Sequence, residues 1–222
     1  MLIRRLVSQA LDLFYPPRCV GCGRLGEWLC PHCVSTAPRM DHPEHVLVDG
    51  ELGERLTVVS VGWHEGVLRQ AVHLLKYEGA RALAAPMGVL MGESWHRQGL
   101  AAGSIVPVPL HQRRQRSRGY NQSQLLAREL GPAVGLPVLD GQLTRTRDTP
   151  AQVGLSLAER QANVRGAFLA GNGLRGAEVV LLDDVCTSGA TLAECARAVH
   201  AAGGVAVAAI TFTRARQLEG AG

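Results

Sequence analysis

The sequence predicts an α/β protein with a mostly parallel sheet flanked by helices. Segments 179–182 and 205–212 consist almost entirely of apolar residues, which is typical of strands that are covered on both faces. Between them, segment 191–202 has apolar residues at helical spacing and is followed by Gly203, a common helix stop. Strands that alternate with helices in this way favour a sheet whose strands run parallel.

Earlier segments extend the same alternation. The patterns predict a strand, two helices, a further strand and a helix, over residues 57–63, 67–75, 84–97, 105–108 and 123–130. Gly131 is expected to end the last of these helices. Residues 2–14 also have helical spacing, and the helix predicted there packs against its own protein, a partner or a membrane surface. Residues 36–56 show no sustained period and contain two prolines, so a connector is expected.

Composition and charge exclude several classes of protein. A chain of 222 residues with 46% hydrophobic and 19% charged residues is typical of a globular protein with one core and a small appendage. The net charge of +4 is below that of a dedicated DNA-binding domain, and 4% aromatic residues provide little for base stacking. No apolar run approaches the roughly 18 residues of a membrane span. The N-terminus lacks the continuous apolar core of a signal peptide, so we expect a cytoplasmic protein.

Two Cys-x2-Cys pairs predict a structural zinc site near the N-terminus. The four thiolates that a tetrahedral zinc ion needs come from Cys19, Cys22, Cys30 and Cys33. Gly21 and Gly23 permit the tight turns that aim two sulfurs at one point. Disulfides are the alternative, and the absence of an export signal disfavours them. Four protein ligands leave no open position, so this zinc would stabilise the fold and take no part in catalysis.

The stretch EVVLLDDVCTSGAT, residues 178–191, predicts a site for a phosphorylated sugar. An apolar strand is expected to end at Asp183 and Asp184, whose carboxylates can accept hydrogen bonds from a vicinal diol. A turn and a helix N-terminus follow, and such turns bind phosphate. The turn residues that could take a 5′-phosphate are Thr187, Ser188, Gly189, Ala190 and Thr191. The alternative is an ordinary strand–turn–helix unit with an aspartate as cap.

A second polar stretch places four arginines within six positions, residues 113–118. A cluster this basic is compatible with a nucleic-acid contact, a solvated loop or a clamp for a small polyanion. It follows the strand predicted over 105–108, so we expect it on a strand-to-helix loop near the phosphate turn.

Taken together, these motifs resemble a known family. LLDDVCTSGAT resembles the motif of type I phosphoribosyltransferases that binds phosphoribosyl diphosphate (PRPP). The whole chain resembles the ComF family of competence-associated proteins, in its Cys pairs and in LLKYEG (74–79), VPVPLHQRR…RGYNQS (106–123) and TPAQVGLSLAERQANVRGAF (149–168). Ser188 departs from the threonine that is frequent there, but it retains the hydroxyl.

The resemblance implies a type I phosphoribosyltransferase fold, with a parallel sheet flanked by helices and a small N-terminal zinc-binding domain. It implies three parts: residues 1–40 with the N-terminal helix and zinc finger, a connector over 41–56, and the phosphoribosyltransferase domain over 57–222.

The resemblance also implies site residues. Asp183, Asp184 and Arg118 would be catalytic, and the diphosphate would bind to Arg113, Arg114, Arg118 and Gly119. Residues 144–165 would form a hood over the site, with Gln152, Arg160 and Asn163 facing the ligand; the alternative for these three is a solvated helix start. Mg²⁺ would bind with PRPP. Lys76 would point toward the site or lie along the surface of its helix, and Cys186 would be a redox-sensing thiolate or a variable position.

The implied function is that of a PRPP-binding, phosphoribosyltransferase-like protein linked to competence and DNA uptake, with a nitrogen nucleophile as the unidentified acceptor. Two alternatives remain. One is a non-catalytic sensor of PRPP or nucleotides. The other is an interaction protein that binds single-stranded DNA and works with a helicase-like partner in DNA uptake. No pattern indicates the oligomeric state.

Overall fold

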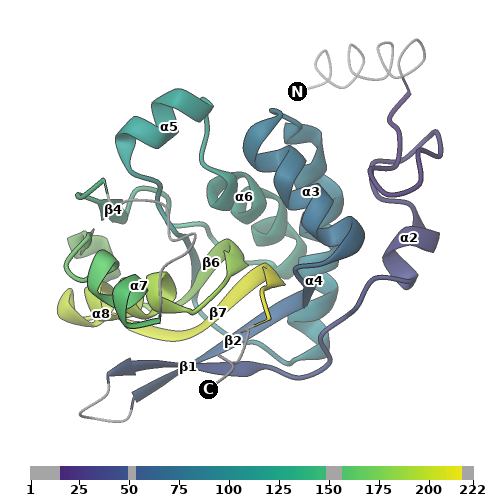
Figure 1. The fold of residues 1–222 in the computed structure, drawn as a ribbon. Helices are drawn as coiled ribbons and strands as arrows, with labels where there is room; N and C mark the ends of the chain where they lie inside the picture. The colour runs from purple at the N-terminus through teal and green to yellow at the C-terminus, as the bar shows by residue number, and fades with distance from the viewer. Residues whose placement is uncertain (1–15, 50–53, 149–156, 217–222) are drawn as a thin grey trace, which may run out of the picture.

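The computed structural model describes residues 16–49, 54–148 and 157–216, and their centre is a five-stranded sheet (Figure 1). Four strands are parallel: β2 (Glu54–Trp63), β7 (Val205–Arg214), β6 (Glu178–Cys186) and β3 (Ser104–Pro107). A fifth, β1 (Glu44–Asp49), pairs antiparallel with β2, which gives the order β1-β2-β7-β6-β3. The α/β class and the mostly parallel sheet are therefore confirmed.

Both faces of the sheet are covered, which explains the continuous apolar strands. In β6, Val180 and Leu182 belong to one hydrophobic core, while Val179 and Leu181 belong to the other. Because successive strand residues point to opposite faces, a strand between two cores must be apolar at every position. All four side chains are fully buried.

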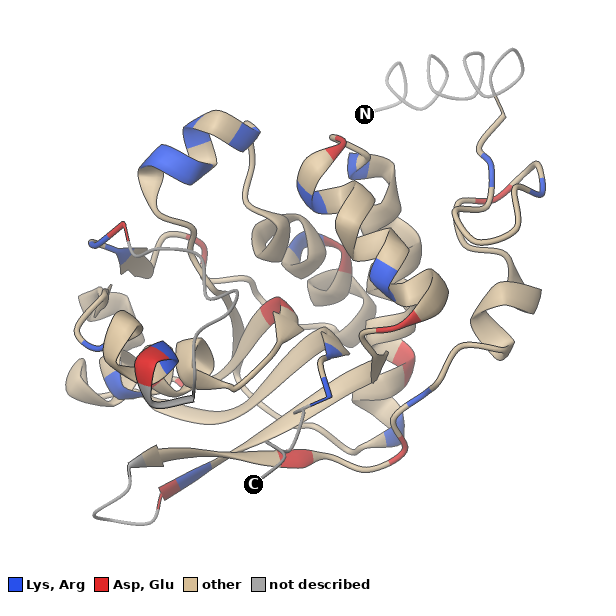
Figure 2. Cartoon of the chain, viewed as in Figure 1, with Lys and Arg blue, Asp and Glu red and all other residues tan. Residues whose placement is uncertain are grey.

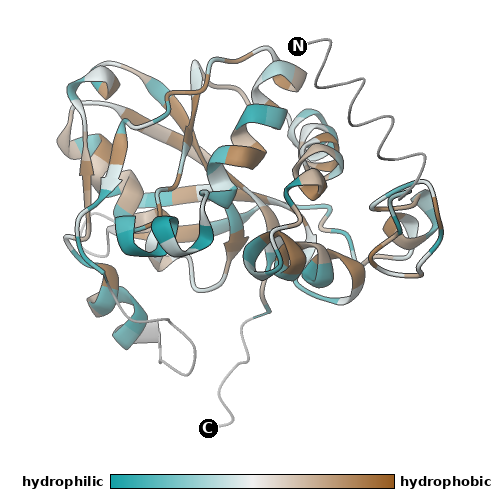
Figure 3. Ribbon diagram, turned by 90° about the horizontal axis from the view of Figure 1, so that it is seen from above, coloured by the Kyte–Doolittle hydropathy of each residue, from teal (hydrophilic) through white to brown (hydrophobic). Residues whose placement is uncertain are grey.

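The helices form a layer on each side of the sheet (Figures 1 and 3). One layer contains α3 (Gly66–Tyr77), α4 (Ala84–Arg97) and α6 (Gln122–Val134), which share a core with β2, β6 and β7. The other contains α8 (Ala190–Ala201), α7 (Leu157–Val164) and the hairpin of β4 (Leu143–Arg145) and β5 (Phe168–Ala170). Shorter helices are α2 (Pro31–Ser35), η1 (Arg81–Leu83), α5 (Gln112–Arg118) and η2 (Asn172–Leu174).

Strand β1 lies in the stretch for which the sequence pattern predicted a connector. Val46 and Val48 are buried, whereas Leu47 between them is 47% exposed. This is the alternation of a strand with one covered face, but it extends over too few residues to stand out beside the prolines. The helix expected over residues 2–14 lies outside the described residues.

Two predicted boundaries are wrong. Helix α6 does not end at Gly131 but continues to Val134, and Gly135 (φ +71°) caps it. A Cβ atom on Gly131 would lie 2.8 Å from Val138 Cγ2 and 3.0 Å from the Leu136 carbonyl oxygen, so this glycine allows close packing and is no helix stop. Strand β6 does not end at the acid pair either, because its pairing with β7 continues through Asp183 to Cys186.

Within the part of the chain that the structure describes, no helix has both the length and the apolar character required to cross a membrane.

Candidate functional site

A cavity of about 620 Å³ opens at the carboxyl ends of the parallel strands. Ligands of open α/β sheets bind at this edge, and the volume is in the usual range for small-molecule sites. The charged groups among the described residues that line it are two carboxylates and six cations: Asp183, Asp184, Arg69, Lys76, Arg114, Arg118, Arg145 and Arg160. This balance favours a ligand with several negative charges.

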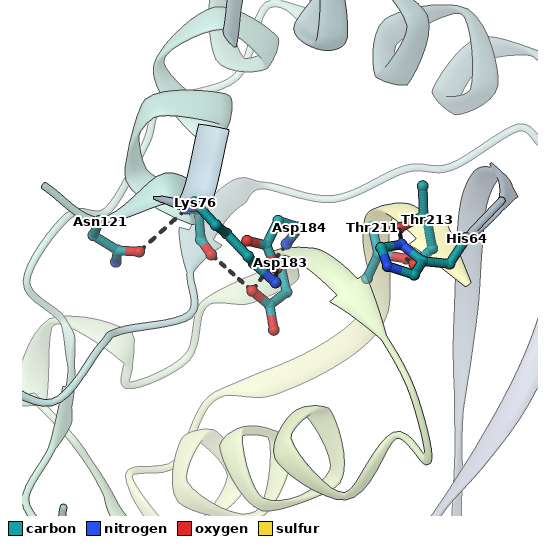
Figure 4. A network of polar contacts seen from close by, with 8 residues as sticks. His64, Lys76, Asn121, Asp183, Asp184, Thr211 and Thr213 are labelled. Atoms are coloured by element: carbon teal, nitrogen blue, oxygen red, sulfur yellow. Dashed lines mark hydrogen bonds and ion pairs between the residues drawn. The ribbon is translucent and has the colours of Figure 1, made fainter. Parts of the chain in front are cut away.

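The acid pair of β6 is held in place by two neighbouring helices (Figure 4). Lys76 Nζ of α3 lies 2.8 Å from Asp184 Oδ1. Asp183 Oδ1 accepts hydrogen bonds from Ser123 Oγ at the start of α6 (2.8 Å) and from the Asp184 backbone N–H (2.9 Å). Lys76 therefore points into the site and does not lie along the surface of its helix.

Burial and neighbouring charges shift the pKa values of Asp183 and Lys76. Burial, followed by the neighbouring Asp184 carboxylate, raises the pKa of Asp183 from 3.8 to about 7. Burial opposes the charge of Lys76, but the contact with Asp184 outweighs it and raises the pKa of the ammonium. Lys76 thus stays cationic, while Asp183 exchanges its proton close to neutrality.

The turn after β6 leads into the N-terminus of α8, which is the strand–turn–helix order predicted for residues 178–191. Thr187 and Thr191 line the cavity, and Gly189 adopts a left-handed conformation (φ +81°) as the N-cap of α8. A Cβ atom on Gly189 would lie 2.4 Å from Val46 Cγ2 of β1. Only glycine fits, both because of its φ and because β1 packs so closely against the turn. Ser188, Gly189 and Ala190 are not among the residues that line the cavity.

Arg214, at the end of β7, holds the start of the turn in place. Its side chain is buried and donates hydrogen bonds to the Thr187 carbonyl oxygen and, at 2.8 Å, to Cys186 Sγ. Its charge is balanced by Glu44 of β1, with 2.5 Å between Nε and Oε2. Burial raises the pKa of Cys186 to about 11, so its thiol stays protonated, and nothing here favours the redox-sensing thiolate.

The arginine-rich stretch forms helix α5 and is not a loop (Figure 2). The His111 side chain accepts a hydrogen bond from the Arg113 N–H at the N-terminus, and Gly119 ends the helix at φ +80°. Arg114 and Arg118 line the cavity. Arg113 points outward, with its side chain 85% exposed and 3.7 Å from Asp148.

The hood stretch is described only in part. Arg160 of α7 lines the cavity, Asn163 of the same helix does not, and Gln152 lies outside the described residues. The sequence interpretation missed Arg145 of β4, which also lines the cavity and has its guanidinium 5.4 Å from the centre of the Phe168 ring. Burial, then the charge of Arg114, lowers the pKa of Arg145.

His64 is a second residue that the sequence interpretation missed. It directly follows β2. Ligands of α/β sheets bind at the carboxyl ends of the strands, and this rule, which indicated the acid pair of β6, also indicates His64. Its Nδ1 lies 2.8 Å from Thr213 Oγ1 of β7 (Figure 4). Burial, then Lys76, lowers its pKa, so His64 presents a neutral imidazole to the cavity.

The four cysteines lie together, as the zinc prediction requires. All four sulfur atoms lie within 4.8 Å of one another. The 3.7 Å between Cys22 Sγ and Cys30 Sγ matches the edge of about 3.8 Å expected for a tetrahedron with Zn–S bonds of about 2.3 Å. The four thiols are free in the structure. Burial opposes ionisation of Cys19, but backbone N–H donors, Cys30 first, lower its pKa to about 6. The cluster therefore fits a zinc ion.

Sequence comparison with known proteins identifies the family of this chain. The phosphoribosyl transferase domain family matches residues 116–221, which contain α6, the acid pair and the turn after β6. The chain is 33% identical to the DNA utilization protein YhgH of Escherichia coli K12 over 195 residues, covering 85% of each protein. It is 27% identical to Competence protein F of Haemophilus influenzae over 197 residues, covering 84% of this chain and 80% of the relative.

Among solved structures, the adenine phosphoribosyltransferase of Trypanosoma brucei in complex with AMP, pyrophosphate and ribose-5-phosphate is 10% identical. The alignment covers 82% of this chain and 94% of that chain, with a TM-score of 0.43. From the sequence relatives and the domain match, the chain belongs to the ComF family of competence and DNA-utilisation proteins and carries a phosphoribosyl transferase domain.

Proposed function

We propose that the protein binds PRPP in the cavity at the carboxyl edge of the sheet. One observation carries this proposal: an acid pair, together with Thr187 and Thr191 from the turn that follows it, lines the same cavity as Arg114 and Arg118. PRPP has matching parts, since it carries a ribose diol between a 5′-phosphate and a diphosphate. The excess of cations in the cavity suits its total negative charge.

The ribose-phosphate end would lie over β6 and α8. The 5′-phosphate would accept hydrogen bonds from the turn, with Thr187 and Thr191 as hydroxyl donors inside the cavity. Asp183 would accept hydrogen bonds from the ribose diol when it is ionised. Because Lys76 holds Asp184 in place, the pair is positioned before the ligand arrives.

The diphosphate end would lie against α5, where Arg114 and Arg118 can form bidentate, charge-assisted bonds. Asp183 and Asp184 are oxygen ligands of the kind that Mg²⁺ prefers. When bound with PRPP, Mg²⁺ would neutralise part of the diphosphate charge.

For an enzyme, the reaction would be pentosyl transfer to a nitrogen nucleophile. As the bond between C1 and the diphosphate oxygen lengthens, positive charge develops on the ribose and negative charge on the diphosphate. Arg118 and Arg114 would stabilise the negative charge in the transition state. Such a role predicts that their removal lowers kcat more than it raises KM.

Isothermal titration of the protein with PRPP and Mg²⁺ tests the binding proposal. We expect one binding site per chain, and a loss of affinity of at least about 100-fold in Asp183→Asn/Asp184→Asn, because two charged partners are removed. Asp140→Asn is the matched control, since Asp140 lies outside the cavity and pairs with Arg128. Absence of binding by the unaltered protein, or equal binding by the double variant, would contradict the proposal.

A non-catalytic sensor would use the same cavity, and consumption of PRPP separates the two roles. An enzyme releases diphosphate when the correct acceptor base is added, whereas a sensor binds PRPP and leaves it intact with every base. Family membership links either role to competence; a cytoplasmic location remains a prediction.

The exposed arginines of α5 favour a second candidate function, binding of single-stranded DNA. Arg113 points to solvent and away from the cavity, so it can contact a phosphate backbone while Arg114 and Arg118 hold PRPP. A DNA role, with the four-Cys cluster free to contact a helicase-like partner, predicts salt-sensitive binding. Arg113→Ala/Arg116→Ala should weaken DNA binding and leave PRPP binding unchanged; unchanged DNA binding would exclude this candidate.

A further inference from the structure

Three consecutive polar residues at the start of α6 are buried, and the last two, Gln122 and Ser123, line the cavity. Asn121, Gln122 and Ser123 are 7%, 1% and 3% exposed. Buried polar groups are nearly always hydrogen-bonded, because an unpaired donor loses its bonds to water without replacement. The partners of these three side chains therefore indicate what each one does.

The outer two residues of this group have partners within the protein. Asn121 Nδ2 donates to the Val108 carbonyl oxygen (2.9 Å), and Asn121 Oδ1 accepts from the Ser123 N–H (3.1 Å), which caps α6. Ser123 Oγ donates to Asp183 (2.8 Å). These bonds fix the first turn of α6 to the end of β3 and to the acid pair.

Gln122 differs from both neighbours. Its side chain lines the cavity, and its Nε2 has no hydrogen-bond partner among the residues that the structure describes. The backbone on either side is fixed by Asn121 and Ser123, so the amide is held in position. A buried, unpaired donor that faces a cavity is explained most simply by an acceptor on the ligand.

We propose that the Gln122 side-chain amide donates a hydrogen bond to an oxygen of the diphosphate group, so that it distinguishes PRPP from ribose phosphates that lack this group. This inference rests on the proposed function. The diphosphate end is assigned because Gln122 lies only a short loop after α5, whose Arg114 and Arg118 line the same cavity.

The test exploits opposite expected effects on binding and on stability. Gln122→Met has nearly the same volume but no donor. Its Kd for PRPP with Mg²⁺ should rise roughly tenfold, the value of one hydrogen bond to a charged acceptor. Its melting temperature without ligand should stay the same or rise, because an unpaired buried polar group has been removed. The Kd for ribose 5-phosphate should not change.

Gln122→Glu is the second variant. It keeps the shape of the side chain but presents oxygen atoms to the diphosphate, and it should weaken PRPP binding by more than the methionine variant. Gln124→Met is the matched control, because Gln124 lies on the same helix and bonds to Asp140 outside the cavity. It should leave the Kd unchanged.

Three results would overturn the inference. Unchanged PRPP affinity in Gln122→Met with a lower melting temperature would show that Gln122 serves the fold. Equal weakening of PRPP and ribose 5-phosphate would move the bond away from the diphosphate. Failure of the unaltered protein to bind PRPP would overturn the proposed function as well, so the titration of the unaltered protein separates the two failures.

Discussion

The four-Cys cluster and the cavity are two polar sites in the described part of the chain, and they differ in how they are assembled. The cluster draws its sulfur atoms from 15 consecutive residues, 19–33, and all of them point at one another. The cavity draws its groups from strand ends and helices that lie between residues 64 and 191. The cluster forms a closed set of ligands, whereas the cavity keeps donors, such as Gln122, that need a partner from outside.

The two sites therefore depend on the fold to different degrees. A closed set of ligands can form from local turns once the metal is present. An open site needs the rest of the protein to bring together groups that lie far apart along the chain. Substitutions should therefore affect the two sites separately.

Cys19→Ser should abolish the cluster, because a structural zinc site loses most of its affinity when one of four thiolates is removed. We expect zinc content, measured by mass spectrometry, to fall from one ion per chain toward zero. PRPP affinity should stay within a few-fold of the original value, since no cavity residue belongs to the cluster. Loss of PRPP binding together with zinc would show that the two sites form one unit.

Lys76→Met should destabilise the cavity side of the protein. It leaves the buried Asp184 carboxylate without its cation, which costs about 3 kcal/mol in free energy of unfolding. Urea unfolding measures the loss. Arg69→Met is the control, because Arg69 also lines the cavity but is exposed; a loss of similar size there would contradict the assignment.

Gly189→Ala should disturb the phosphate turn. The left-handed φ and the contact with Val46 together cost about 3 kcal/mol. Gly79→Ala is the matched control, with φ +70° and no atom within 4 Å of the added Cβ; it should cost about 1 kcal/mol. Thermal unfolding compares the two. Equal losses would mean that β1 does not constrain the turn.

PRPP binding should depend on pH through Asp183. Its pKa is about 7 in the folded protein and 3.8 ordinarily, so the folded state holds the extra proton between these values. Stability should therefore fall as pH rises from about 4 to 7. Affinity for PRPP with Mg²⁺ should rise over the upper part of this window, by roughly fivefold from pH 6 to 7, as the ionised fraction of Asp183 increases.

Titration calorimetry at several pH values measures this dependence, and Asp183→Asn should abolish it. Zinc content should stay constant over the same pH range near neutrality, which would show that the pH effect is confined to the cavity. A flat affinity profile in the unaltered protein would show that Asp183 is not the titrating ligand group.

The two sites also differ in how well the sequence predicted them. The cluster was predicted completely, because the spacing of its four cysteines is a local signal. The acid pair and the turn were predicted for the same reason, since they follow one another along the chain. His64 was missed although it directly follows a predicted strand, whereas Arg145 was missed because it reaches the cavity through the pairing of β4 with β5, which no sequence pattern indicated.

The fold, too, was predicted where a local sequence pattern was strong and was missed where it was weak. The central strands and the main helices were predicted from their apolar patterns. Strand β1 was missed because a short edge strand with one buried face has only two inward residues, Val46 and Val48. Helix α5 was taken for a loop because it has no buried residue, so no apolar period marks it.

Hydrogen exchange measured by mass spectrometry, with and without saturating PRPP and Mg²⁺, locates the PRPP site along the chain. We expect slower exchange in β6 and the turn up to Thr191, and in α5 with the start of α6, while residues 19–33 exchange at the same rate. No protection in β6 and its turn, or protection confined to the four-Cys cluster, would contradict the proposed site.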